Sequence, residues 1–177
     1  MMYESANELN ELQRMLDASA STEGAHMRSI FKPEHRLSAS QVSSCLQGVI
    51  QVAVATVSSK GEPSVAPVDA VFYRAKFVLS TDKKSLRARH LARNPALSVT
   101  YFEGADPVVI AHGRARFIGP DDPEFADLDK EWVKAYGSSI LGLSNSVVFV
   151  RLEPRLMFAF AFHPERFKDT RRVSQVE

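Results

Sequence analysis

Hydrophobic residues follow two different periods along this chain, and the change of period separates a helical N-terminal part from a strand-rich remainder. Apolar side chains recur at helical spacing over residues 5–18, which predicts a short amphipathic helix. They are Leu9, Leu12, Met15 and Leu16. A second helix is predicted over residues 37–47, because Ser38 can cap its first turn and Gly48 stands just past its end. Residues 1–36 are therefore interpreted as a helical extension, an arm outside the core that needs an apolar partner surface.

Beyond residue 48 the pattern is typical of strands joined by tight turns. Residues 49–57 are rich in β-branched side chains and precede a polar turn at 58–61, which predicts a hairpin with residues 63–73. Further strands are predicted over residues 76–80, 97–102, 108–118, 147–152 and 156–162, with Pro154 between the last two and Gly113 marking a bulge.

Two helices are inserted into this series of strands and do not alternate with it. The first is predicted over residues 83–93, and the second begins at 120–123 and runs to about Tyr136. This order predicts a mainly β fold, an antiparallel barrel and not a Rossmann sheet. We assign residues 37–162 to this barrel and residues 163–177 to a charged C-terminal tail.

Composition narrows the classes of partner. The 22 Lys and Arg residues nearly balance 21 Asp and Glu, a formal charge of +1, so no global field attracts nucleic acid or an acidic membrane. No apolar run is long enough for a bilayer span or a signal-peptide core, and the expected location is the cytoplasm. Cys45 is the single cysteine, interpreted as a small buried hydrophobe, and the five histidines lack metal-ligand spacing, so no metal site is predicted.

The stretch of residues 78–89 carries the most informative chemistry. It passes from a strand end through hydroxyl groups into a helix with basic residues, an arrangement suited to an anion. Ser80, Thr81 and Ser85 supply hydroxyls, and Arg87 lies one turn into the helix. The alternative is an ordinary capped helix with a solvated basic face, in which Asp82 would also repel a phosphate.

Several segments occur in the order found in one known family. They are residues 52–57, Gly61, Pro63, residues 65–68, residues 80–95 and the run His112-Gly113-Arg114-Ala115. Over residues 37–162 the chain resembles the pyridoxamine 5′-phosphate oxidase-like FMN-binding split barrels. The resemblance implies a six-stranded split barrel, a homodimer, and two flavin sites at the subunit interface.

The resemblance also assigns roles to individual residues. Arg87 takes the place of the basic residue, usually Lys, that holds the flavin phosphate, with Ser85 two positions before it. Ser80 and Thr81 match the strand-end hydroxyls beside the phosphate and ribityl chain. The candidate set is completed by Lys84 of the same basic segment and by the strand whose backbone faces the isoalloxazine ring, namely Val65, Ala66, Pro67 and Val68.

Trp132 is a further candidate, together with Tyr136, since aromatic side chains on the inserted helix can cover the flavin ring or the substrate. Its helical spacing with Phe125 and Leu128 favours core packing instead. No catalytic residue is named, because in each flavin case the cofactor performs hydride transfer while the protein positions it.

Departures from the family pattern restrict the function. The chain lacks the C-terminal arm that carries the substrate-binding Arg and His groups of true pyridoxamine phosphate oxidases, so vitamin B6 oxidation is disfavoured. The run Arg151-Leu152-Glu153-Pro154 is similar to part of that arm but lies too early, and we interpret it as coincidence. Arg87 in place of Lys keeps the charge but changes the geometry, which leaves the cofactor's identity open.

The leading hypothesis is an FMN-binding oxidoreductase with a small-molecule electron acceptor. One alternative is a reductase that uses an 8-hydroxy-5-deazaflavin coenzyme. Others are a non-catalytic flavin- or haem-binding carrier and a cofactor-free structural dimer.

Overall fold

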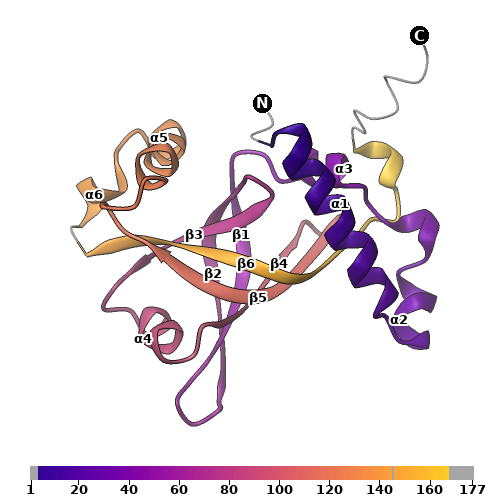
Figure 1. Cartoon of the computed structure of the whole chain (residues 1–177), viewed down its shortest axis with the longest axis horizontal. Helices are drawn as coiled ribbons and strands as arrows, with labels where there is room; N and C mark the ends of the chain where they lie inside the picture. The colour runs from indigo at the N-terminus through magenta and orange to yellow at the C-terminus, as the bar shows by residue number, and fades with distance from the viewer. Residues whose placement is uncertain (1–3, 145, 168–177) are drawn as a thin grey trace.

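Six antiparallel strands close into a barrel in the computed structural model, which describes residues 4–144 and 146–167 (Figure 1). The strands are β1 (Val49–Val57), β2 (Pro63–Tyr73), β3 (Lys76–Asp82), β4 (Ala96–Phe102), β5 (Val108–Ile118) and β6 (Val147–Phe160). Around the barrel their order is β1-β2-β3-β6-β5-β4. The prediction of a mainly β, six-stranded antiparallel split barrel with inserted helices is confirmed.

Local hairpins supply half of the barrel, and pairings between distant segments close it. Strands β1 and β2 pair along their whole shared length, from Val49 opposite Val71 to Val57 opposite Pro63. Gly61 in the connecting turn has a φ of 81°, a left-handed conformation that favours glycine. Closure comes from β1 with β4 and from β6, which pairs with both β3 and β5.

Strand β6 is continuous, so the prediction of two strands separated at Pro154 is wrong. The ladder between β5 and β6 shifts register between His112 and Gly113, and Gly113 then lies opposite Pro154. A bulge tolerates a residue without an N–H, which explains why the proline does not end the strand. A Cβ atom on Gly113 would lie 2.0 Å from the Glu153 carbonyl oxygen, so the predicted bulge at Gly113 is confirmed and needs glycine.

Serine caps determine where the first two predicted helices begin. Helix α1 (Ala6–Ser21) begins after Ser5, and α3 (Ala39–Cys45) begins after Ser38; each serine forms a capping box. Helix α3 ends at Cys45 with Leu46 as its C-cap, two residues earlier than predicted, and Gly48, whose φ is 73°, lies beyond that cap, just before β1. The short helices α2 (Ala25–Ile30) and α6 (Ile140–Leu143) and the 3₁₀ turns η1 (Pro33–His35) and η2 (Pro164–Arg166) were not predicted, because one turn or two carries too little periodicity.

The N-terminal segment belongs to the core, so the expectation of an arm outside it is wrong. Leu12 and Leu16 of α1 are buried in the cluster that contains Val42 of α3 and the barrel residues Val54 and Phe77. The partner surface that the apolar face of α1 needs is therefore the chain's own barrel.

The start of the predicted C-terminal tail is also fastened. Gln41 Nε2 donates to the carbonyl oxygen of Pro164 at 2.7 Å, and Phe167 packs against the same core cluster. Residues 168–177 of the predicted tail lie outside the described residues.

A second cluster lies outside the barrel, under helix α5 (Phe125–Tyr136). Leu128 and Trp132 of α5 are buried with Val71, Val78 and Phe149, one residue from each of β2, β3 and β6. The helix begins at Phe125, later than predicted, and ends as predicted at Gly137, whose φ is 74°. The other inserted helix, α4 (Leu86–Arg93), lies away from α5 and near the β1–β2 hairpin (Figure 1).

Candidate functional site

The candidate anion-binding segment is the short turn that leads from β3 into α4. Ser85 is the N-cap of α4, and its hydroxyl accepts a hydrogen bond from the backbone N–H of Ala88 at 3.0 Å. The helix therefore begins at Leu86, three residues later than the predicted start at Lys83. Ser85 therefore supplies the helix cap that the alternative interpretation of this segment requires.

Three of the predicted residues meet in one hydrogen-bonded cluster. The Thr81 and Ser85 hydroxyl oxygens lie 3.0 Å apart, and Arg87 Nη1 donates to Thr81 Oγ1 at 3.3 Å. Thr81 is only 5% exposed, whereas Ser85 and Arg87 are half-buried. The cluster therefore presents a guanidinium and a hydroxyl at the start of a helix, where backbone N–H groups carry partial positive charge.

Arg87 has no carboxylate partner within residues 4–144 and 146–167. Burial lowers the pKa of its guanidinium, because partial desolvation disfavours the charged form. A half-buried cation whose described side-chain hydrogen bond is to a neutral hydroxyl is suited to an anion from outside the chain.

Asp82 lies beside this cluster but is held by other groups. Its carboxylate accepts hydrogen bonds from the Ser146 hydroxyl and from the backbone N–H of Lys84, the latter at 2.6 Å. Both hydrogen bonds lower the pKa of the Asp82 carboxyl below its usual value, and the bond from Ser146 has the larger effect. Asp82 thus stays ionised and stabilises the turn, and its negative charge remains beside the cluster as the sequence suggested.

Ser80 and Lys84 lie apart from the cluster. Ser80 precedes Thr81 on β3 and so projects to the opposite side of the strand. Lys84 is exposed in the turn, where its described contact is the backbone bond to Asp82.

The predicted ring-facing strand borders an open depression. Val65, Ala66 and Pro67 line a cavity of about 300 Å³ together with Gln51, Val52, Ala53 and Phe102. Val65 is 70% exposed and Phe102 is 57% exposed, while Val68 is buried toward the core. The β2–β3 pairing covers Ala70 to Tyr73, so this part of β2 pairs with β1 alone among the described strands.

Trp132 is buried, as the core-packing interpretation predicted. Its ring packs edge-on against Phe149 at a centroid distance of 5.8 Å, and Tyr136 stacks on it at 4.8 Å. Tyr136 is therefore the aromatic residue of this pair that reaches the surface. Its hydroxyl donates to Asp69 of β2, two residues past Pro67. Burial, and after it this contact with the Asp69 carboxylate, raises the pKa of Tyr136 to about 12.

Sequence reasoning named Tyr136 with Trp132 as a possible cover for the flavin ring, but it missed the contact of Tyr136 with Asp69 beside the candidate strand. Tyr136 and Asp69 are 67 positions apart in the chain, so spacing does not reveal their contact. Helical spacing places Tyr136 on the same face as Trp132 but does not show which of these two rings is buried.

A buried contact fixes α4 against the barrel. Thr56 Oγ1 of β1 and His90 Nδ1 of α4 lie 3.0 Å apart, and both residues are almost fully buried. The contact determines where the start of α4, and with it Arg87, stands relative to β1.

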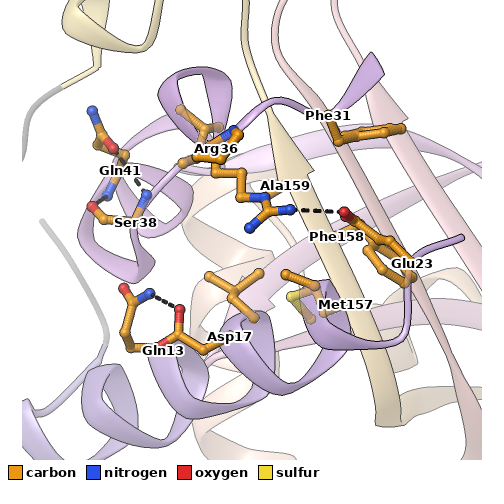
Figure 2. Close-up of a pocket in the computed structure, with 14 residues that line it drawn as sticks. Gln13, Asp17, Glu23, Phe31, Arg36, Ser38, Gln41, Met157, Phe158 and Ala159 are labelled. Atoms are coloured by element: carbon orange, nitrogen blue, oxygen red, sulfur yellow. Dashed lines mark hydrogen bonds and ion pairs between the residues drawn. The ribbon is translucent and has the colours of Figure 1, made fainter. Parts of the chain in front are cut away.

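A cavity of about 350 Å³ lies between α1, residues 31–41 and β6 (Figure 2). The helices that border it, α1 and α3, lie on a different side of the barrel from α4 (Figure 1). Arg36 lines it and pairs through Nη2 with Glu23 at 2.8 Å, so opposite charges in its wall neutralise each other. We interpret this pair as a contact that fastens the N-terminal segment.

Other polar groups singled out in the sequence have structural partners. Arg151 pairs with Glu124 and Glu153, which joins β6 to the start of α5. His112 is exposed on β5 and hydrogen-bonds Ser98 through Nδ1 at 2.8 Å. In the part of the chain that the structure describes, no three His, Cys, Asp or Glu side chains gather as metal ligands would, and no helix is both long and apolar enough to cross a bilayer.

The closed barrel and the turn at the end of β3 place this chain in the class of split-barrel proteins. More narrowly, it belongs to the pyridoxamine 5′-phosphate oxidase family, whose model matches residues 39–168. No curated protein matches the chain.

Solved structures share the barrel at low sequence identity. The conserved hypothetical protein Rv2991 from Mycobacterium tuberculosis has a TM-score of 0.64 at 18% identity, over 79% of this chain and 94% of its own. The haem storage protein HutZ from Vibrio cholerae has a TM-score of 0.56 at 19% identity, over 62% and 85%. An F420 reductase has a TM-score of 0.52 at 17% identity, over 63% and 91%. These similarities establish the fold.

Proposed function

We propose that this protein is a flavin-dependent oxidoreductase that binds the phosphate of FMN through Arg87, Thr81 and Ser85. The observation that carries the proposal is the half-buried guanidinium of Arg87, which lacks a carboxylate partner in the described residues. Family membership supports it, because the family resemblance gives this position to the phosphate-binding residue.

The residues present fit a phosphate monoester. Arg87 can donate two parallel hydrogen bonds to phosphate oxygens, and each charge-assisted bond contributes about 1.5 to 3 kcal/mol. The first backbone N–H groups of α4 and the hydroxyls of Thr81 and Ser85 add further donors. Ser80, on the other side of β3, is proposed to face the ribityl chain, and Lys84 to add positive charge from the turn.

The isoalloxazine ring is proposed to lie against β2 at Val65, Ala66, Pro67 and Val68. This segment pairs with one described neighbour only, so its backbone is accessible along the other edge. Tyr136, which donates to Asp69 and stacks on Trp132, is proposed to close the adjacent side of the ring site. The bound flavin would supply hydride transfer, and these residues would orient it and exclude water.

A homodimer accompanies this proposal. Val65 and Phe102 expose apolar side chains around the depression on the outer face of β1, β2 and β4. Exposed apolar groups that gather around a depression mark interaction sites, and we propose that a second copy of this chain covers this face. The partner copy would then complete the wall of the ring site.

The phosphate anchor does not discriminate between flavin rings, so an 8-hydroxy-5-deazaflavin coenzyme, which also carries phosphate, is the second candidate. The electron acceptor is proposed to be a small molecule that reaches the ring between the two subunits.

The identity of the bound group is testable with the native protein. Mass spectrometry of the ligand released after gentle purification is expected to detect FMN, with a flavin absorption spectrum that bleaches when reduced nicotinamide dinucleotide is added without oxygen. Bound deazaflavin would favour the second candidate, and a bound flavin that no reductant bleaches would favour a carrier. A colourless protein that binds neither compound in titration would contradict the proposal.

A further inference from the structure

A second basic surface lies on the other side of α4. Residues of the β1–β2 hairpin and of α4 enclose a depression of about 280 Å³. Lys60 of the hairpin and Arg89 and Arg93 of α4 contribute to its wall, and the two arginines share one helix face because they are four residues apart. We name this depression, by these three residues, the basic groove.

The cations of the basic groove are not neutralised within the described chain. Lys60, Arg89 and Arg93 are exposed, and none forms an ion pair with residues 4–144 or 146–167. Glu62 is the one carboxylate in the wall, and it lies 3.5 Å from the hydroxyl of Ser58. Three positive charges against one negative charge leave a concave, positively charged surface with serine hydroxyls at its edge.

This combination suits a doubly charged phosphate. One arginine suffices for a carboxylate, whereas a phosphate monoester carries up to two charges and accepts hydrogen bonds on three oxygens. In the unrelated Rossmann fold an arginine near the ribose accommodates the 2′-phosphate of NADP, and the same pairing of guanidinium with phosphate is available here. The basic groove and the Arg87 cluster lie on the same helix, so a dinucleotide in the groove would stand next to the proposed flavin site.

We propose that the basic groove binds the 2′-phosphate of NADPH and thereby selects NADPH as the hydride donor. The inference rests on the proposed function, which requires a hydride donor. It adds a specificity site, formed by Arg89 and Arg93, that is separate from the residues proposed to hold the flavin.

Calorimetric titration with 2′,5′-ADP and with 5′-AMP tests the inference without turnover. The intact protein is expected to bind 2′,5′-ADP at least about tenfold more tightly, because the 2′-phosphate adds charge-assisted bonds. The double substitution Arg89→Ala with Arg93→Ala is expected to abolish this preference. Both side chains are exposed and make no described side-chain hydrogen bond, so the fold should persist. The matched control Arg28→Ala removes one exposed charge from α2, on another side of the molecule (Figure 1), and should retain the preference.

Equal affinities for the two nucleotides, or a preference that survives the double substitution, would overturn the inference. FMN titration of the same samples separates it from the proposed function. If the protein binds FMN but shows no preference for the 2′-phosphate, only the proposed role of the basic groove is refuted. If the preference depends on the two arginines but the protein binds no flavin, the nucleotide site in the basic groove is supported and the proposed flavin site is refuted.

Discussion

Thr56 Oγ1 and His90 Nδ1 lie 3.0 Å apart in the interior, where they join β1 to α4. Each group would be left without that partner if the other were removed, and an unsatisfied buried polar group costs about 1 to 3 kcal/mol. The position of α4, which carries both Arg87 and the basic groove, thus depends on a contact between residues 34 positions apart.

The substitution Thr56→Val tests this contact, because it removes the hydroxyl with little change of shape. We expect the free energy of unfolding in urea to fall by about 1 to 3 kcal/mol. Thr100→Val is the control, since Thr100 is half-buried on β4 and makes no side-chain hydrogen bond in the described part of the chain. Equal effects of the two substitutions would show that the Thr56–His90 contact contributes nothing specific.

Gly113 should not tolerate a side chain. A Cβ atom there would overlap the carbonyl oxygen of Glu153, so Gly113→Ala must displace β6 at its bulge. Forcing extra atoms into a packed site costs about 1 to 3 kcal/mol, and we expect a loss in the upper part of this range by chemical denaturation. Gly119→Ala, where nothing lies within 4 Å of the new atom, should change stability by less than about 0.5 kcal/mol. A neutral Gly113→Ala would contradict the described register.

The N-terminal helix should contribute to global stability. Leu16→Ala removes side-chain atoms from the cluster shared with the barrel, and we expect a loss of about 2 to 5 kcal/mol in the free energy of unfolding. Leu86→Ala makes the same change at an exposed leucine and should have little effect. If Leu16→Ala leaves the unfolding transition unchanged, α1 is an arm outside the core after all.

The proposed dimer should depend on the apolar face around Phe102. Phe102→Asp places a charge on this face, and light scattering should then report the monomer mass where the unaltered chain gives twice that mass. Ile30→Asp changes another exposed apolar residue, on α2, and should leave the dimer intact. A monomeric unaltered chain, or a dimer that tolerates Phe102→Asp, would contradict the proposed interface.

Local patterns in the sequence predicted most of the elements, because hairpins and caps depend on neighbouring residues. Ser38 caps the start of α3 as expected, and the turn at Gly61 joins the expected strands, although α3 ends at Cys45, before the predicted end at Gln47. The closing pairs of β6 with β3 and β5 could not be predicted from periodicity, since they join distant segments. The error at Pro154 has the same origin, because the bulge that accommodates the proline is formed with β5.

The candidate site was predicted in part. Residue types and order placed Thr81, Ser85 and Arg87 together, and the structure brings these three into one cluster. Spacing could not show that Ser85 caps α4, that Ser146 holds Asp82, or that Tyr136 covers Trp132. Each of these depends on which distant element lies opposite, and that information resides in the tertiary packing.

The most direct test of the central claim compares FMN with riboflavin, which lacks the phosphate, in the intact protein and in Arg87→Ala. We predict that Arg87→Ala weakens FMN binding by about tenfold to a hundredfold, the equivalent of about 1.5 to 3 kcal/mol, while riboflavin binds both proteins equally. Arg28→Ala should leave both affinities unchanged. Equal losses for FMN and riboflavin, or no loss for either, would contradict a phosphate site at Arg87.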